Sequence, residues 1–257
     1  MTQALPKIVT FDEFITWYPE KSRVRYELHN GEIVEMSQPT GKHERIKGFS
    51  AAELTLEFRR LNLPYFIPNQ AIVKPPERES GYFPDVLILN DVALVDEPFW
   101  EKSSTVTKGA SIPLVIEVVS SNSDFSRYLE NLSLNLSPCR RETLNFPPSR
   151  NGKGARGLGQ SLVFPHDEKS QSSNWRDDYY LKLADYEQMG IPEYWIVDYA
   201  ALAAMKFIGN PKQPTISVYQ LIDGKYQVSQ FKGSERIISP SFPELILTAE
   251  QIFNAGQ

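Results

Sequence analysis

Two carboxylates and one lysine have types and positions that suit hydrolytic chemistry. Asp85 precedes the apolar run VLIL, Glu117 lies inside the apolar run PLVIEVV, and Lys182 lies in a helical pattern further along the chain. Carboxylates on neighbouring strands can bind a divalent cation, and a nearby ammonium can lower the pKa of metal-bound water or stabilise a pentavalent phosphate. With Asp85 and Glu117 as metal ligands and Lys182 as the third catalytic residue, the pattern predicts phosphodiester hydrolysis.

Each of these residues also has a purely structural interpretation. Glu117 needs a partner inside an apolar strand because desolvation of its charge is costly, and an arginine or lysine would serve as well as a metal. Asp85 at the start of a strand could cap a turn. Lys182 could extend to solvent, or pair with Asp178 four residues earlier on the same helical face.

Three further residues are candidates for supporting roles. His43 stands at the beginning of a predicted helix, where it could bind a phosphate or cap the helix. Glu27 and Glu32 flank Asn30-Gly31, a dipeptide that strongly predicts a two-residue hairpin turn because both turn positions require positive φ. The two glutamates could reach the site if this hairpin folds over it.

The inventory of metal-binding side chains favours a hard cation. The chain has one cysteine, Cys139, and its three histidines, His29, His43 and His166, form no H-x-x-x-H pair. This excludes an intrachain disulfide framework and a thiolate zinc site. The ligands would be mainly oxygen atoms, and oxygen ligands indicate magnesium or manganese.

Composition and charge narrow the class of protein. A chain of 257 residues that is 41% hydrophobic can bury a large core. It contains no run near the roughly 18 apolar residues that a membrane helix needs, and its first residues lack a signal-peptide pattern, so we expect a cytoplasmic location. The net charge of −5 argues against nonspecific coating of DNA but allows an enzyme with a locally basic rim.

Hydrophobic periodicity predicts an α/β or α+β fold. The near-continuous apolar runs at 81–90 and 111–120 are typical of strands at the centre of a sheet. In the long helix, Leu54 and Leu56 fall on adjoining stripes that we expect to be buried together. The predicted helices are 10–17, 43–62, 178–190 and 247–256, with a hairpin at 23–36 and strands at 65–77, 81–90, 111–120, 193–199 and 215–228.

Residues 123–174 differ in composition and hydrophobic pattern from the rest of the chain. They are rich in Ser, Asn, Gly, Pro and Arg without a sustained period, which predicts disorder, and the triplet Ser-Ser-Asn precedes them at 120–122 and ends them at 172–174. We interpret the segment as an in-frame insertion into a single domain spanning 1–257, the alternative being an ordinary long surface loop. It would carry a charge of +2 and leave −7 on the rest.

Several motifs make the chain resemble the Uma-type restriction endonuclease family of the PD-(D/E)xK nuclease superfamily. They are YELHNGEIVEMS, HERIKG, FPDVLIL, PLVIEVVSSN and DDYYLKLADYEQMGIPEYWIVDY. The resemblance implies a restriction-endonuclease-like core, a mixed sheet flanked by helices, with Asp85 as the motif aspartate and Glu117 as the second metal ligand. The superfamily's usual lysine position holds Val119 here. The resemblance implies that the lysine has migrated to the following helix, where Lys182 stands.

The leading hypothesis is a magnesium-dependent DNA endonuclease, and a homodimer would suit cleavage of both strands of a duplex. The alternative is a catalytically inactive nuclease-fold module that binds nucleic acid or regulates a partner. The insertion lies between Glu117 and Lys182, on the connection that brings the lysine to the metal, and a misplacement of about 1 Å can cost about a hundredfold in rate. A purely structural protein, with Glu117 paired to a basic side chain, is a third hypothesis.

Overall fold

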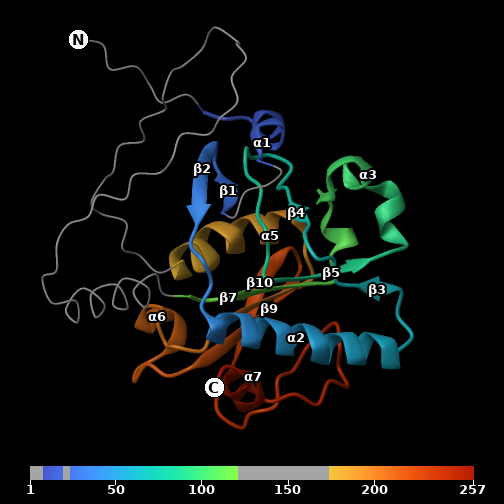
Figure 1. Ribbon diagram of the computed structural model, residues 1–257. Coiled ribbons are helices and arrows are strands. Elements are labelled where there is room, and N and C mark those ends of the chain that lie inside the picture. The colour runs from blue at the N-terminus through green and yellow to red at the C-terminus, as the bar shows by residue number, and fades with distance from the viewer. Residues whose placement is uncertain (1–7, 20–23, 121–173) are drawn as a thin grey trace, which may run out of the picture. The chain divides into compact units, whose positions relative to one another are not determined.

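A computed structural model describes residues 8–19, 24–120 and 174–257 of the protein (Figure 1). Its main sheet has six strands in the order β10-β9-β8-β7-β5-β3. Strands β7 and β8 pair in parallel and the other neighbours pair antiparallel, so the mixed sheet is confirmed. The strands are β3 (Tyr65–Phe66), β5 (Val86–Asn90), β7 (Leu114–Val118), β8 (Glu193–Asp198), β9 (Thr215–Ile222) and β10 (Lys225–Phe231).

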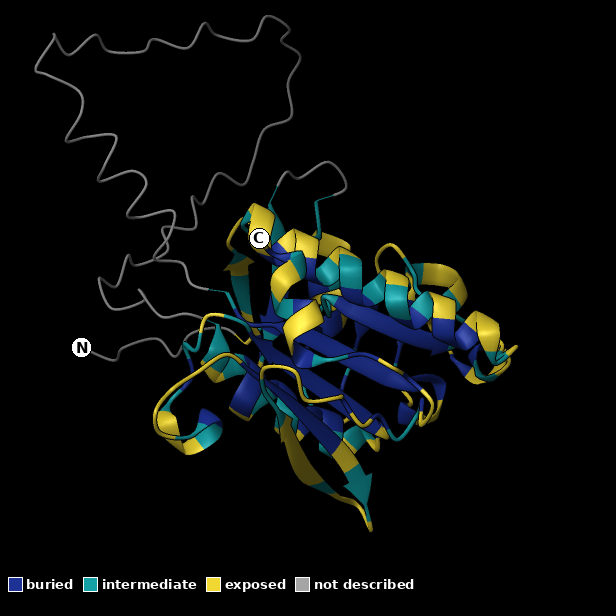
Figure 2. Ribbon diagram, turned by 90° about the horizontal axis from the view of Figure 1, so that it is seen from below, coloured by how far each residue is buried: buried dark blue, intermediate teal, exposed yellow. Residues whose placement is uncertain are grey.

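Helices cover both faces of this sheet, and the central strands are buried (Figures 1 and 2). Helices α2 (Gly41–Arg60) and α7 (Ala249–Ala255) pack on one face, where the core includes Leu54 and Ile116. Helix α5 (Leu183–Met189) continues a π-helix, η3 (Asp177–Lys182), and packs on the other face with Val115. The apolar side chains of the buried strands therefore pack against helices on both faces of the sheet.

The predicted hairpin forms strands β1 (Arg25–His29) and β2 (Glu32–Met36) around the expected turn. Asn30 and Gly31 have φ of 50° and 83°, as that turn requires. Leu28 exchanges backbone hydrogen bonds of 3.0 and 2.8 Å with Gly81, and these bonds hold the hairpin against the chain that leads into β5. Two short strands, β4 (Ile72–Val73) and β6 (Thr105–Val106), form a parallel pair beside it.

The remaining predicted helices are also present. Thr10 caps α1 (Phe11–Trp17) through a capping box with Glu13, and α7 closes the described chain behind a second capping box. Gly190 ends α5 in the left-handed conformation at φ 78°, as its position predicts. Short helices that the periodicity did not predict are η1 (Ala93–Asp96), α3 (Trp100–Ser103), η2 (Gly109–Ser111) and α6 (Met205–Ile208).

Two expectations about local structure were wrong. Leu56 is 65% exposed, because only the stripe through Leu54 and Phe58 faces the sheet. The predicted strand at 65–77 is limited to β3 and β4, and its proline residues cannot donate ladder hydrogen bonds.

Among the described helices, none is long and apolar enough to cross a membrane.

The predicted insertion at 123–174 lies outside the described residues except for its last one. Ser120, just after β7, donates its backbone N–H to Oδ1 of Asn174 across 2.9 Å. The described chain therefore leaves the sheet and re-enters the domain at neighbouring points. Strand β7, before residues 121–173, pairs with β8, after them, so both parts of the described chain belong to one sheet.

Burial in α2 predicts a large difference between two leucines of the same helix. Leu54→Ala removes a fully buried side chain, so we expect the free energy of unfolding to fall by about 2–5 kcal/mol. Leu56→Ala changes an exposed side chain and should cost less than about 0.5 kcal/mol. Urea unfolding of both variants measures the two losses. Equal losses would contradict the packing of α2 described above.

Candidate active site

The two acids predicted to bind metal face the same side of the sheet. In β7, Ile116 and Val118 belong to the core under α2, whereas Val115 and Val119 belong to the core under α5. Side chains alternate along a strand, so Glu117 points toward α5. The same alternation in β5 places Asp85, which directly precedes it, on the side of Leu87.

Lys182 lies among three carboxylates and is only 2% exposed. Its Nζ is 3.0 Å from Glu117 Oε1, 3.5 Å from Asp178 Oδ1 and 3.6 Å from Glu27 Oε1. Burial disfavours the ammonium, but the three carboxylates outweigh it and raise the pKa of Lys182 well above its usual range. The pairing with Asp178 and the position beside Glu117, which the sequence offered as alternatives, occur together.

Glu117 is buried and has an unusual ionisation. Its Oε1 accepts hydrogen bonds from Lys182 and from the hydroxyl of Tyr186, at 3.0 and 3.3 Å. The pKa of Glu117 is raised to about 7. Burial is the largest influence, the charges of Asp85 and Glu27 act in the same direction, and Lys182 opposes the shift. Without a metal ion, the charged form of this buried carboxyl group is therefore poorly stabilised.

Asp85 has the opposite environment. Its Oδ2 accepts hydrogen bonds from His43 Nε2 at 3.1 Å and from the backbone N–H of Val118 at 2.9 Å. Burial disfavours the charge, yet these bonds and the charge of His43 outweigh it and lower the pKa of Asp85. Asp85 in turn raises the pKa of His43, against the effect of burial. The cap of α2 is Thr40, so the predicted capping role of His43 was wrong.

The hairpin brings one of its two glutamates to the site. Glu27 is 1% exposed; its Oε1 accepts the N–H of Phe83 at 2.8 Å, and its Oε2 lies 2.8 Å from His29 Nε2. Its pKa is lowered, because Lys182 and His29 outweigh its burial. Glu32 is exposed and, within the part of the chain that is described, has no side-chain hydrogen bond or ion pair with these groups. The expectation that both glutamates reach the site was correct for Glu27 alone.

No site role was predicted for Asp178 and Tyr186, although each stands four residues from Lys182. Asp178 is fully buried, and neither of its carboxylate oxygens has a hydrogen bond from another described residue. Its pKa is raised well above the usual range, first by burial and then by Glu117 and Asp85, although Lys182 opposes the shift. The signal was the spacing of four residues, which places side chains on one face of a helix.

The donor set fits a divalent cation held through oxygen. The hydrogen bonds to Asp85 and Glu117 use Oδ2 and Oε1, and the other oxygen of each carboxylate has no partner among the described residues. The raised pKa of Glu117 reflects excess negative charge that a cation would neutralise. The described residues contain no cluster of three or more His, Cys, Asp or Glu ligands, so water or substrate oxygens would complete the shell.

The ionisation of Glu117 predicts a pH-dependent stability without metal. Its carboxyl keeps a proton up to about pH 7 in the folded protein but releases it near pH 4.5 when unfolded. The folded state binds more protons in this window, so the contribution of Glu117 to the free energy of unfolding falls as pH rises. As the pH rises from 5 to 7.5, the free energy of unfolding of Glu117→Gln should increase by roughly 1–3 kcal/mol relative to that of wild type.

Urea unfolding in EDTA across this range measures the gain. Glu32→Gln is the matched control, because it removes the same charge from an exposed position. A difference between Glu117→Gln and wild type that stays constant from pH 5 to 7.5 would contradict the proposed protonation.

Comparisons with known proteins place the chain in a family. The Uma2 family, described as "Putative restriction endonuclease", matches residues 11–134 and 171–250. The chain is also similar to the crystal structure of a "putative nuclease belonging to DUF820" from Anabaena variabilis ATCC 29413, with a TM-score of 0.57, 15% identity and coverage of 97% of this chain and 99% of that one. No curated protein matches. The chain has a restriction-endonuclease-like core and belongs to the Uma2 family.

Proposed function

We propose that the protein is a metal-dependent endonuclease that hydrolyses DNA phosphodiester bonds in the cytoplasm. The observation that carries the proposal is the excess of buried carboxylates around Lys182, which contacts Glu117 at 3.0 Å beside Asp85 while the pKa of Glu117 remains raised to about 7. Membership of the Uma2 family and the similarity of fold to a nuclease support it. Cleavage of both strands of a duplex would be served by a homodimer.

The proposed roles follow from the environment of each group. Asp85 and Glu117 would hold magnesium or manganese, and the bound ion would supply activation of water and polarisation of the phosphate. Lys182 stays protonated, because its carboxylate neighbours raise its pKa, and orients the attacking water or stabilises charge on the phosphate. Glu27 positions Lys182, and His43 holds Asp85 through the hydrogen bond to Oδ2.

The central prediction is metal-dependent nicking of supercoiled plasmid. Wild type should convert plasmid to the open circle with magnesium or manganese, and EDTA should abolish the reaction. Asp85→Asn, Glu117→Gln and Lys182→Met should each lower the rate on the order of a hundredfold or more, because each removes a charge from the reacting centre. Agarose gels of time courses measure the rates.

Glu32→Gln is the control, since this glutamate is exposed and should leave the rate unchanged. Nicking that survives in Glu117→Gln would reject the proposed centre. Binding of DNA without cleavage by the wild type would instead indicate an inactive nucleic-acid-binding module.

A second prediction concerns the segment between Glu117 and Lys182. Deleting 123–174 joins Asn122 to Trp175, so Asn122 takes the place before Trp175 from which Asn174 accepts the hydrogen bond of Ser120. Lys182 already contacts Glu117 in the full chain, so we expect the deletion variant to nick plasmid within about threefold of the wild-type rate. Activity in the deletion variant alone would show that the segment inactivates the enzyme.

A further inference from the structure

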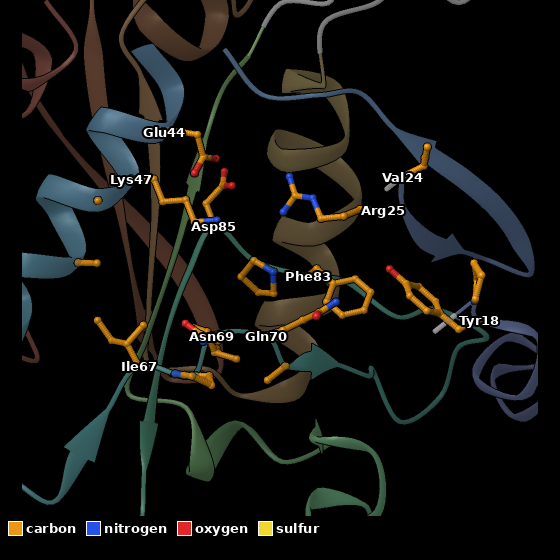
Figure 3. Close-up of a pocket in the computed structure, with 17 residues that line it drawn as sticks. Tyr18, Val24, Arg25, Glu44, Lys47, Ile67, Asn69, Gln70, Phe83 and Asp85 are labelled. Atoms are coloured by element: carbon orange, nitrogen blue, oxygen red, sulfur yellow. The ribbon is translucent and has the colours of Figure 1, made fainter. Parts of the chain in front are cut away.

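A pocket of about 440 Å³ opens beside Asp85 (Figure 3). Its wall is formed by the hairpin, α2, the chain around 67–71 and the segment that leads into β5. Asp85 is part of this wall, so the pocket is continuous with the proposed metal-binding carboxylates. Its volume lies within the roughly 300–1,000 Å³ typical of sites that enclose a small ligand.

Two cations extend into this pocket from elements that also supply the site. Arg25 lies two residues before Glu27 on β1, so both side chains point to the same face of the hairpin. Lys47 lies one helical turn after His43 on α2. Figure 3 shows both side chains directed toward the region of Asp85.

Neither cation has an ion-pair partner within the described part of the chain. Arg25 and Lys47 are both partly buried, and no side-chain hydrogen bond or salt bridge to another described residue involves either of them. Lys47 acts on its neighbours only through its charge, which lowers the pKa values of Asp85 and His43. Among the described residues no ion pair occupies the donors of Arg25 and Lys47, so they can bind an anionic ligand beside Glu44 and Asp85, the two carboxylates that also line the pocket.

The rest of the wall suits a planar polar ring. Phe83 and Tyr18 are in contact, with ring centroids 5.7 Å apart, and form an aromatic surface on one side. Asn69 and Gln70 also line the pocket and are exposed, so their amides are available to both donors and acceptors. Aromatic surfaces that accept stacked bases, beside cations that contact the backbone, are typical of sites for single-stranded nucleic acid.

We propose that this pocket binds one unpaired nucleotide of the substrate strand, adjacent to the phosphate that is cleaved. Arg25 and Lys47 contact the phosphate of that nucleotide, and the base stacks on Phe83 with its polar edge toward Asn69 and Gln70. The inference rests on the proposed function and narrows its substrate class. The preferred DNA is single-stranded, or a duplex from which one nucleotide is extruded.

The test is DNA binding without cleavage. Fluorescence anisotropy in EDTA compares a fluorescein-labelled eight-nucleotide single strand with a duplex of the same sequence. Wild type should bind the single strand at least tenfold more tightly. Arg25→Ala and Lys47→Ala should each weaken single-strand binding about tenfold and reduce the slope of log affinity against log salt by about 0.7–1. Phe83→Leu should weaken it at least fivefold at unchanged salt slope.

Arg59→Ala is the matched control, because it removes one cation from the exposed last turn of α2, away from the pocket. Thermal unfolding confirms that each variant is folded. The pocket is rejected if wild type does not bind the single strand, if it binds the duplex as tightly, or if the pocket variants behave like Arg59→Ala. The binding assay contains no metal, so its result does not depend on cleavage. If wild type cuts no plasmid but the pocket variants lose single-strand binding, the proposed nuclease activity is refuted and the proposed nucleotide pocket is supported.

Discussion

The buried ammonium of Lys182 is the interaction on which the rest of the site depends. It lies within 3.6 Å of carboxylate oxygens from β1, β7 and η3, which are distant in sequence. Buried carboxylates without a counter-charge would repel one another and lose hydration that the interior does not replace. A single cation therefore joins the hairpin, the central strand and the helix into one unit, and its long flexible side chain suits contact with several partners.

One lysine cannot neutralise all the carboxylates around it. The site accommodates the remaining negative charge in two ways. Asp85 keeps its charge through the hydrogen bonds of His43 and Val118. Lys182 and Tyr186 donate hydrogen bonds to Glu117, and no described residue donates one to the carboxylate of Asp178, yet burial raises the pKa of both acids. Protons and a metal ion therefore compete for the same negative charge, and binding of the metal would be coupled to proton release.

The sequence predicted the main elements and the two acids and the lysine that the structure brings together. Apolar runs identified β5 and β7, and their alternation places Asp85 and Glu117 on one face. Contacts between residues far apart in the sequence could not be predicted in this way. Glu27 lies three residues before the hairpin turn and Glu32 directly after it, and the backbone bonds between Leu28 and Gly81 hold the strand of Glu27 against the domain. The contact of His43 with Asp85 spans 42 residues and has no local pattern.

The contact between Ser120 and Asn174 has a consequence for the evolution of the domain. Where the two ends of a connection are already held together, the entropy lost in closing a flexible loop grows only with the logarithm of its length, by about 0.6 kcal/mol per doubling. This position can therefore accept many residues at little thermodynamic cost. Any inserted segment there lies between Glu117 and Lys182 in the chain and joins the domain just before the helix that carries the lysine.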